Sequence, residues 1–134
     1  MDQLEIAEIG EFGENALRAG LTPDRFAEQA RLTVTLDDGS TFVVIPDFLD
    51  ASGSLVVNNR LQLVYREAKA STVRTPTIAQ LTDNQARFVD AILNGRIQSI
   101  STTDSGLIAL IENTPGASGF DVVGFELNVF DVVQ

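Results

Sequence analysis

The stretch LTVTLDDGSTFVVI, residues 32–45, decides the fold. Its first half alternates apolar and polar residues, a pattern typical of a strand with one buried face. Asp38 and Gly39 then supply the two central residues of a type I′ turn, since glycine tolerates the positive φ that this turn requires. The stretch therefore predicts an antiparallel β-hairpin in which Val34 stands opposite Val43.

The same pairing sets Leu32 opposite Ile45 and gives both strands one apolar face. Phe42 and Val44 make the other face of the return strand apolar as well. A strand with two apolar faces needs cover on both sides. We therefore expect the return strand to be central in its sheet or to be covered by a partner.

The N-terminal residues 1–20 carry an acidic residue at every third position from Glu5 to Glu14, and the segment also contains Gly10 and Gly13. Glycine costs about 1 kcal/mol in a helix interior. The segment is therefore predicted to be either a weak surface helix or an extended arm.

A second short helix is predicted next. Thr22 is a suitable N-cap, and Pro23 suits the first helical position. Phe26, Ala27 and Ala30 would form the narrow apolar face of this helix.

The middle of the chain is predicted to contain two connectors, with a segment between them that forms one or two strands. Residues 46–54 are predicted to be a loop, and residues 67–78 a polar connector. Residues 55–66 are either one long strand or a hairpin that turns at Asn58 and Asn59.

The clearest helix begins at Thr82, whose side chain can cap it, and Gln85 completes a capping box. Gly95 is placed to end the helix in a left-handed conformation. The apolar stripe of this helix consists of Phe88, Val89, Ile92 and Leu93.

The rest of the chain predicts three further strands. Residues 96–103 form the first, and after a turn at 104–106 residues 107–111 are predicted to be a short, fully buried strand. A loop at 113–119 then leads to the last strand, residues 120–133.

The last strand carries apolar side chains on both faces, which an edge strand facing water does not tolerate. We therefore expect it to lie at the centre of its own sheet or to be covered by another chain. The candidate interface residues are Phe120, Phe125, Leu127, Val129, Phe130 and Val132.

The composition indicates one domain spanning residues 1–134. The chain is 44% hydrophobic and 21% charged, which is ordinary for a globular protein, and its length suits a single core. The predicted fold class is α+β, with antiparallel hairpins that form a sheet, a sandwich or a small barrel and with two or three short helices.

The chain contains no histidine, cysteine or tryptophan. This removes the commonest general base, the usual zinc ligands and every serine–histidine or cysteine–histidine pair. Asp47 and Asp50 share a loop but lack the spacing of a calcium loop, so we interpret them as solvated acids. The hydroxyl-rich residues 99–105 could line a ligand pocket, but cross-strand pairing is the favoured interpretation. We expect no catalytic residue, no cofactor and no metal.

The formal charge of −10 repels phosphate backbones and anionic lipid headgroups, so direct binding to nucleic acid or membranes is not expected. The acidic N-terminus lacks the basic and apolar regions of a secretory signal. No apolar run approaches the length of a membrane-spanning helix.

In composition the chain resembles accessory structural proteins of tailed phages, such as capsid cement or tail components: it is acidic, free of cysteine and rich in valine and threonine. The resemblance implies a non-enzymatic subunit that acts through oligomeric contacts, with its own copies or with other virion proteins. Its expected location is the virion or the cytoplasm of the producing cell, and no small-molecule substrate is expected.

Two other functions stay open on the sequence. The charge also fits an acidic regulatory or inhibitory protein that binds another protein by mimicking nucleic acid. A small enzyme or ligand carrier would need a concave pocket that holds two carboxylates with perturbed pKa values.

Overall fold

The computed structural model describes residues 6–71 and 81–131. This part of the chain folds into three helices and eight strands, which confirms the predicted α+β class. In chain order the elements are α1 (Ile6–Gly20), β1 (Phe26–Glu28), β2 (Leu32–Leu36), β3 (Thr41–Val44), β4 (Phe48–Asp50), β5 (Val56–Val57), β6 (Arg60–Ser71), α2 (Asp83–Leu93), β7 (Ile97–Thr102), α3 (Ser105–Glu112) and β8 (Gly119–Asp131).

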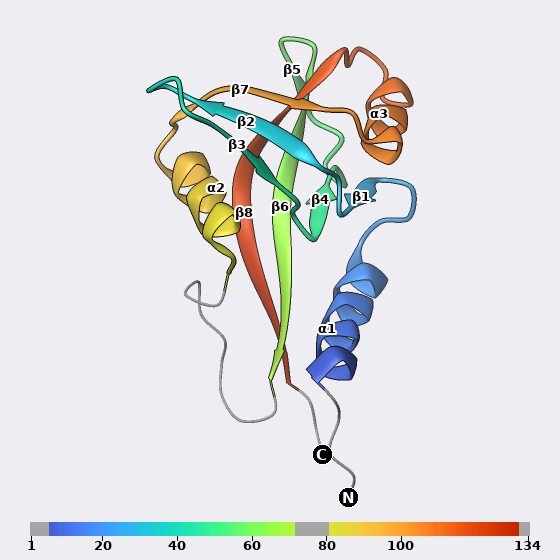
Figure 1. Ribbon diagram of the computed structural model, residues 1–134. Coiled ribbons are helices and arrows are strands. Elements are labelled where there is room, and N and C mark those ends of the chain that lie inside the picture. The colour runs from blue at the N-terminus through green and yellow to red at the C-terminus, as the bar shows by residue number, and fades with distance from the viewer. Residues whose placement is uncertain (1–5, 72–80, 132–134) are drawn as a thin grey trace, which may run out of the picture.

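The strands form two sheets that pack against each other (Figure 1). In the first sheet the order is β1-β4-β6, with β8 on the opposite edge of β6 and β5 beside the start of β6. The second sheet has the order β3-β2-β7. The two sheets do not close into a barrel, and α2 and α3 lie at the two ends of β7 (Figure 1).

One parallel pair, which the sequence did not predict, joins the antiparallel hairpins. β6 and β8 run side by side from Arg60 opposite Gly119 to Ser71 opposite Asp131. Parallel neighbours need a long crossover connection, and the chain between β6 and β8 includes α2, β7 and α3. The first sheet is therefore mixed.

The predicted hairpin is confirmed as β2 and β3, but its register is one residue away from the prediction. Val34 stands opposite Phe42 and not opposite Val43. This shift places four side chains together in the core: Leu32, Val34, Phe42 and Val44. Ile45 instead points outward and is 44% exposed, because a slip of one residue exchanges the two faces of a strand.

The register differs because the turn is not type I′. That turn needs positive φ at both central residues, whereas here Gly39 has a φ of 86° and Asp38 has no positive φ. The Leu36 amide donates to the carbonyl oxygen of Ser40, and the Gly39 amide donates to the carbonyl oxygen of Leu36. These bonds close a three-residue loop, which is the geometry of a type I turn followed by a glycine bulge. Ser40 donates its hydroxyl and its amide to the Asp38 carboxylate, and these bonds lower the pKa of Asp38.

Among the described strands β3 lies at the edge of its sheet, so the first of the two alternatives, a central return strand, was wrong, and cover by a partner stays a prediction. Its outer side is partly covered by the start of α2. The Asn84 amide donates to the carbonyl oxygen of Val43 at 2.8 Å, and the Arg87 guanidinium lies 4.5 Å from the ring centre of Phe42.

The predicted second helix was wrong, because residues 26–28 form strand β1. Left-handed backbone at Asp24 (φ 63°) and Gln29 (φ 51°) prevents a continuous helix from forming here. β1 pairs with β4, which lies inside the segment 46–54 that was predicted to be a loop. β1 and β4 form because two short segments far apart in sequence pair with each other. The local propensity of each segment does not predict this pairing.

The hairpin alternative is the one observed for residues 55–66. Asn58 and Asn59 both have positive φ, 52° and 64°, as a type I′ turn requires. β6 then continues to Ser71, so the first five residues of the predicted connector 67–78 belong to a strand. Pairing with β8 supports this extension, and residues 72–78 lie outside the described residues.

Helix α2 follows the prediction at both ends. Thr82 accepts a hydrogen bond from the Gln85 amide, the reciprocal bond completes the capping box, and Gly95 is left-handed with a φ of 64°. The predicted apolar stripe holds at Phe88 and Val89, which are buried. It fails at Leu93, which is 63% exposed.

The segment 107–111 forms most of helix α3 and not the predicted buried strand. The Asp104 carboxylate caps the helix by accepting the amide of Leu107 at 2.9 Å. Leu107 and Leu110 then share the buried face, three residues apart. A short apolar run fits a strand and a helix equally well, so the cap decides between them.

β8 pairs only with β6 in the described part of the chain, so it lies at the edge of its sheet and not at the centre. A bulge at Val123 interrupts its alternation: Val122 stands opposite Leu63, and Gly124 opposite Val64. The extra residue, Val123, is 54% exposed. Val122 and Phe125 therefore share one face of β8, opposite Leu63 and Tyr65.

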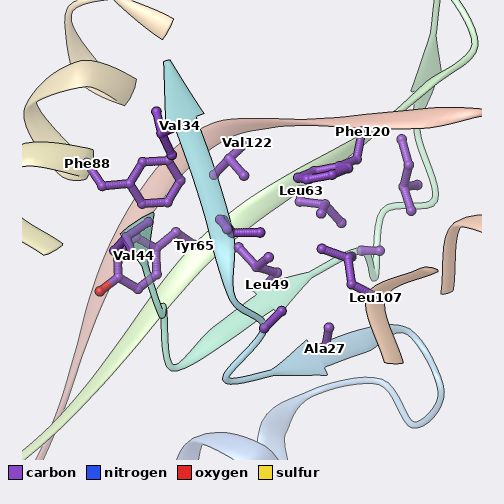
Figure 2. Close-up of a cluster of buried hydrophobic side chains, with 14 of the residues drawn as sticks. Ala27, Val34, Val44, Leu49, Leu63, Tyr65, Phe88, Leu107, Phe120 and Val122 are labelled. Atoms are coloured by element: carbon purple, nitrogen blue, oxygen red, sulfur yellow. The ribbon is translucent and has the colours of Figure 1, made fainter. Parts of the chain in front are cut away.

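The main core lies between the two sheets and α2 (Figure 2). The Tyr65 ring contacts Phe88 and Phe125, with ring centres 5.7 Å and 5.0 Å away. Its hydroxyl donates to the buried Glu67 carboxylate at 2.5 Å. Burial, together with the hydrogen bond and the negative charge of Glu67, raises the pKa of Tyr65 far above its usual value.

Of the two predicted forms of the N-terminal segment, residues 6–20 adopt the helical one, α1. α1 packs beside β6 in Figure 1. A second hydrophobic cluster joins it to the first sheet and consists of Leu17, Leu21, Phe48 and Ala68. The Arg18 guanidinium also pairs with Glu28 at the edge of that sheet.

Replacing Gly39 with valine should lower the free energy of unfolding by about 1–3 kcal/mol, because a β-branched residue is strained at positive φ. Urea unfolding would measure the change. Gly53→Ala is the control, since Gly53 has no positive φ and a methyl group there meets no neighbouring atom. Equal effects at both positions would show that strain at Gly39 is not the cause.

The stability of the protein should fall above about pH 10, the usual pKa of tyrosine. The pKa of Tyr65 is raised in the folded state, so above pH 10 the unfolded chain loses this proton first and unfolding becomes easier. The expected slope is about 1.4 kcal/mol per pH unit. Urea titrations with tyrosinate absorbance measure it, because Tyr65 is the single tyrosine. Tyr65→Phe should remove this contribution, and a tyrosinate signal near pH 10 in folded protein would contradict it.

Candidate protein interface

Two strands with an unpaired edge, β7 and β8, line the same cavities on the side of the molecule where the sheets do not join. In the described part of the chain β7 pairs only with β2, and β8 only with β6. Each strand therefore presents one edge without a neighbouring strand. β7 passes over the upper part of β8 on its way from α2 to α3 (Figure 1).

Two cavities of about 310 Å³ each lie between these edges and share Ile100. One joins Ile97 and Ile100 to residues 121–123, and the other joins Ile100 and Thr102 to residues 118–120. β7 and the start of β8 therefore run in opposite directions. We call these two neighbouring cavities together the β7–β8 groove.

The lining of the groove is mainly apolar. The end of α2 closes one side through Ile92, and α3 lies at the other through Ile108 and Ile111. Two of its large apolar side chains are strongly exposed, Val123 at 54% and Ile108 at 37%. Exposed apolar groups next to free strand edges are typical of a surface that binds another chain.

Three charged side chains line the groove. The Arg60 guanidinium pairs with Asp121 at 2.6 Å and also donates to the carbonyl oxygen of Phe120. Glu112, at the end of α3, has no cationic partner within the described residues. The α3 side of the groove therefore carries one uncompensated negative charge.

The structure divides the six candidate interface residues of the last strand. Phe120 is 4% exposed and belongs to the core, with part of its surface lining the groove. Phe125 packs against Tyr65, and Leu127 is half-buried. Other parts of the same chain therefore cover these three side chains at least in part. The side chains of Val129 and Phe130, and the whole of Val132, lie outside the described part.

The groove residues that sequence reasoning missed are Ile97, Ile100, Ile108 and Val123. Ile97 and Ile100 are three residues apart, which does not fit the alternation of a flat strand. β7 accommodates this spacing with an irregularity opposite residues 35 and 36. Ile108 was assigned to a buried strand because the cap at Asp104 was interpreted as a turn.

The hydroxyl-rich segment 99–105 does not form a pocket of its own. Ser99 and Ser101 stand opposite Thr35 and Thr33 on the outer face of the second sheet, where both serines are exposed. Thr102, which faces the other way, is the one hydroxyl of this segment that lines the groove.

The loop acids are bonded within the fold, so the interpretation of both as solvated acids was wrong for the buried Asp50. Asp50 is 5% exposed and accepts from Arg66 at 2.7 Å and from the Ser52 amide at 2.8 Å. Asp47 accepts the amide of Ala68 at 3.1 Å. Across residues 6–71 and 81–131 no three acidic side chains come together as a metal site would require.

Comparisons of the chain with protein-family models, with curated proteins and with solved structures found no match. Within the described residues, no helix is both long and apolar enough to span a membrane. The groove must therefore be interpreted from its own geometry.

Asp50→Asn should lower the free energy of unfolding by about 1–3 kcal/mol, because it weakens a buried bond to Arg66. Asp121→Asn is the matched control: its carboxylate also pairs with an arginine but is 41% exposed, so the loss should stay below about 1 kcal/mol. Urea unfolding of both variants measures the difference. Equal losses would contradict the structural role assigned to Asp50.

Proposed function

We propose that this protein is a non-enzymatic assembly subunit that acts by binding other protein chains. The observation that carries the proposal is the β7–β8 groove, in which two free strand edges flank an apolar surface. Such a surface loses contact with water only when another chain covers it, and apolar burial of this kind drives stable association.

The finer form of the proposal is a virion component of a tailed phage, either a capsid cement protein or a tail protein. The composition supports it: the chain is acidic and free of cysteine and histidine. The placement of the acids adds support, since the buried carboxylates of Asp50 and Glu67 are hydrogen-bonded within the fold. A subunit of a lattice needs a stable fold and contact surfaces, and the β7–β8 groove is the surface that we propose for such contacts.

Closed symmetry is the simplest way for such a subunit to repeat, and a dimer or trimer set on a larger lattice is the preferred form. The C-terminal strand supports this because β8 has a free edge along the described chain. Contacts with the strand's last residues are part of the proposal.

A second candidate function is an acidic inhibitor that occupies the nucleic-acid site of another protein. The formal charge of −10 favours it, because nineteen acidic residues stand against nine basic ones. Its binding would weaken strongly in salt, whereas assembly through apolar contacts would not.

Sedimentation over a range of protein concentrations tests the proposal. The full chain should form a closed oligomer, and a chain lacking residues 130–134 should be monomeric while α2 keeps its circular dichroism signal. The deletion shortens the free edge of β8 and removes the apolar end of the strand. A full chain that is monomeric at every concentration and shows turnover of its own would refute the assembly function.

A further inference from the structure

The β7–β8 groove follows β7 from Ile97 to Thr102. β7 has six residues, which corresponds to a length of about 20 Å. The two cavities follow one another along this length and meet at Ile100. An extended segment presents every second side chain to the same face, so alternate residues would enter the cavities in turn.

The backbone of β7 also offers hydrogen bonds. Only β2 pairs with it among the described strands, so its other edge carries amide and carbonyl groups that a sheet neighbour could bond. An added strand would gain main-chain hydrogen bonds from this edge and side-chain contacts from the cavities. This combination is specific to extended partners, since a helix cannot pair with a strand edge.

The charge of the groove determines which extended segments it attracts. Glu112 lines the cavity beside α3 together with Ile108, one helical turn away, and makes no ion pair within the described residues. Arg60 lines the same cavity, but its guanidinium pairs with Asp121. The protein as a whole carries a charge of −10. A basic side chain at the corresponding end of the partner would therefore be attracted, and an acidic one repelled.

We propose that the β7–β8 groove binds an extended segment of a different protein, with apolar side chains at alternate positions and a lysine or arginine at the end next to Glu112. The inference rests on the proposed function and names the chemistry of the partner. A second copy of this chain is disfavoured in the groove, because each copy carries a formal charge of −10 and lacks the net positive charge that would be attracted to Glu112.

A capped heptapeptide that alternates valine and threonine between two terminal lysines is the probe. Fluorescence anisotropy at about 0.05 M and about 0.3 M NaCl measures its Kd. We expect a Kd below about 1 mM that rises with salt, and at least roughly tenfold weaker binding when glutamates replace the lysines. Methylating alternate peptide nitrogens on the pairing edge should abolish binding, and amide exchange in Ile97–Thr102 should slow when the unmodified peptide binds.

Variants of the protein locate the site. Ile108→Asp and Val123→Asp change exposed positions and should each weaken binding at least roughly tenfold. Val57→Asp is the matched control, because Val57 is 45% exposed on β5 and does not line the groove. Glu112→Lys should reverse the preference in favour of the glutamate peptide. Thermal unfolding of each variant verifies that it is folded.

Three results would overturn the inference: no binding of the lysine peptide below about 1 mM, equal binding of the lysine and glutamate peptides, or undiminished binding by the Ile108 and Val123 variants. The assembly function can fail separately. If the protein assembles normally but does not bind the peptide, the proposed function stands and the proposed partner is refuted. If the protein binds the peptide but is monomeric at every concentration and shows turnover of its own, the binding site stands and the assembly function is refuted.

Discussion

The parallel pairing of β6 with β8 is the constraint on which the rest of the structure depends. It holds the C-terminal strand beside the middle of the chain over the whole length of β6, from Arg60 to Ser71. Parallel neighbours cannot be joined by a tight turn, so the connection must cross the sheet. That crossover contains α2, β7 and α3, and it places Phe88 of α2 against Tyr65 of β6 in the centre of the core.

The same constraint leaves the molecule open on one side. On the closed side the chain passes directly from β1 to β2 and from β3 to β4, and the Gln29 amide bonds to the carbonyl oxygen of Asp47 between these two connections. On the open side β7 belongs to the crossover and pairs with β2, so it lies next to β8 without pairing with it. The β7–β8 groove is the consequence, and its apolar floor exists because Phe120 and Val122 must face the core.

The acidic side chains of the interior differ in their bonding from those that line the groove. The buried or half-buried acids are occupied within the fold, as the bonds of Asp50 to Arg66 and of Glu67 to Tyr65 show. Of the two acids that line the groove, Asp121 pairs with Arg60, whereas Glu112 makes no ion pair within the described residues. The interior carboxylates therefore serve stability, and Glu112 is the acid on which the proposed charge preference of the groove depends.

The sequence by itself determined the elements whose signals are local. Thr82, Gln85 and Gly95 mark the ends of α2 by hydrogen bonding and backbone freedom, and the segment around Gly39 had to turn because few other residues adopt its conformation. Tertiary structure decided what depends on distant partners. The register at Phe42, the strand at Phe26–Glu28 and the bulge at Val123 each follow from pairing that spacing along the chain cannot report. The groove belongs to this second kind, because Ile100 and Val123 become neighbours only when the crossover has folded onto the sheet.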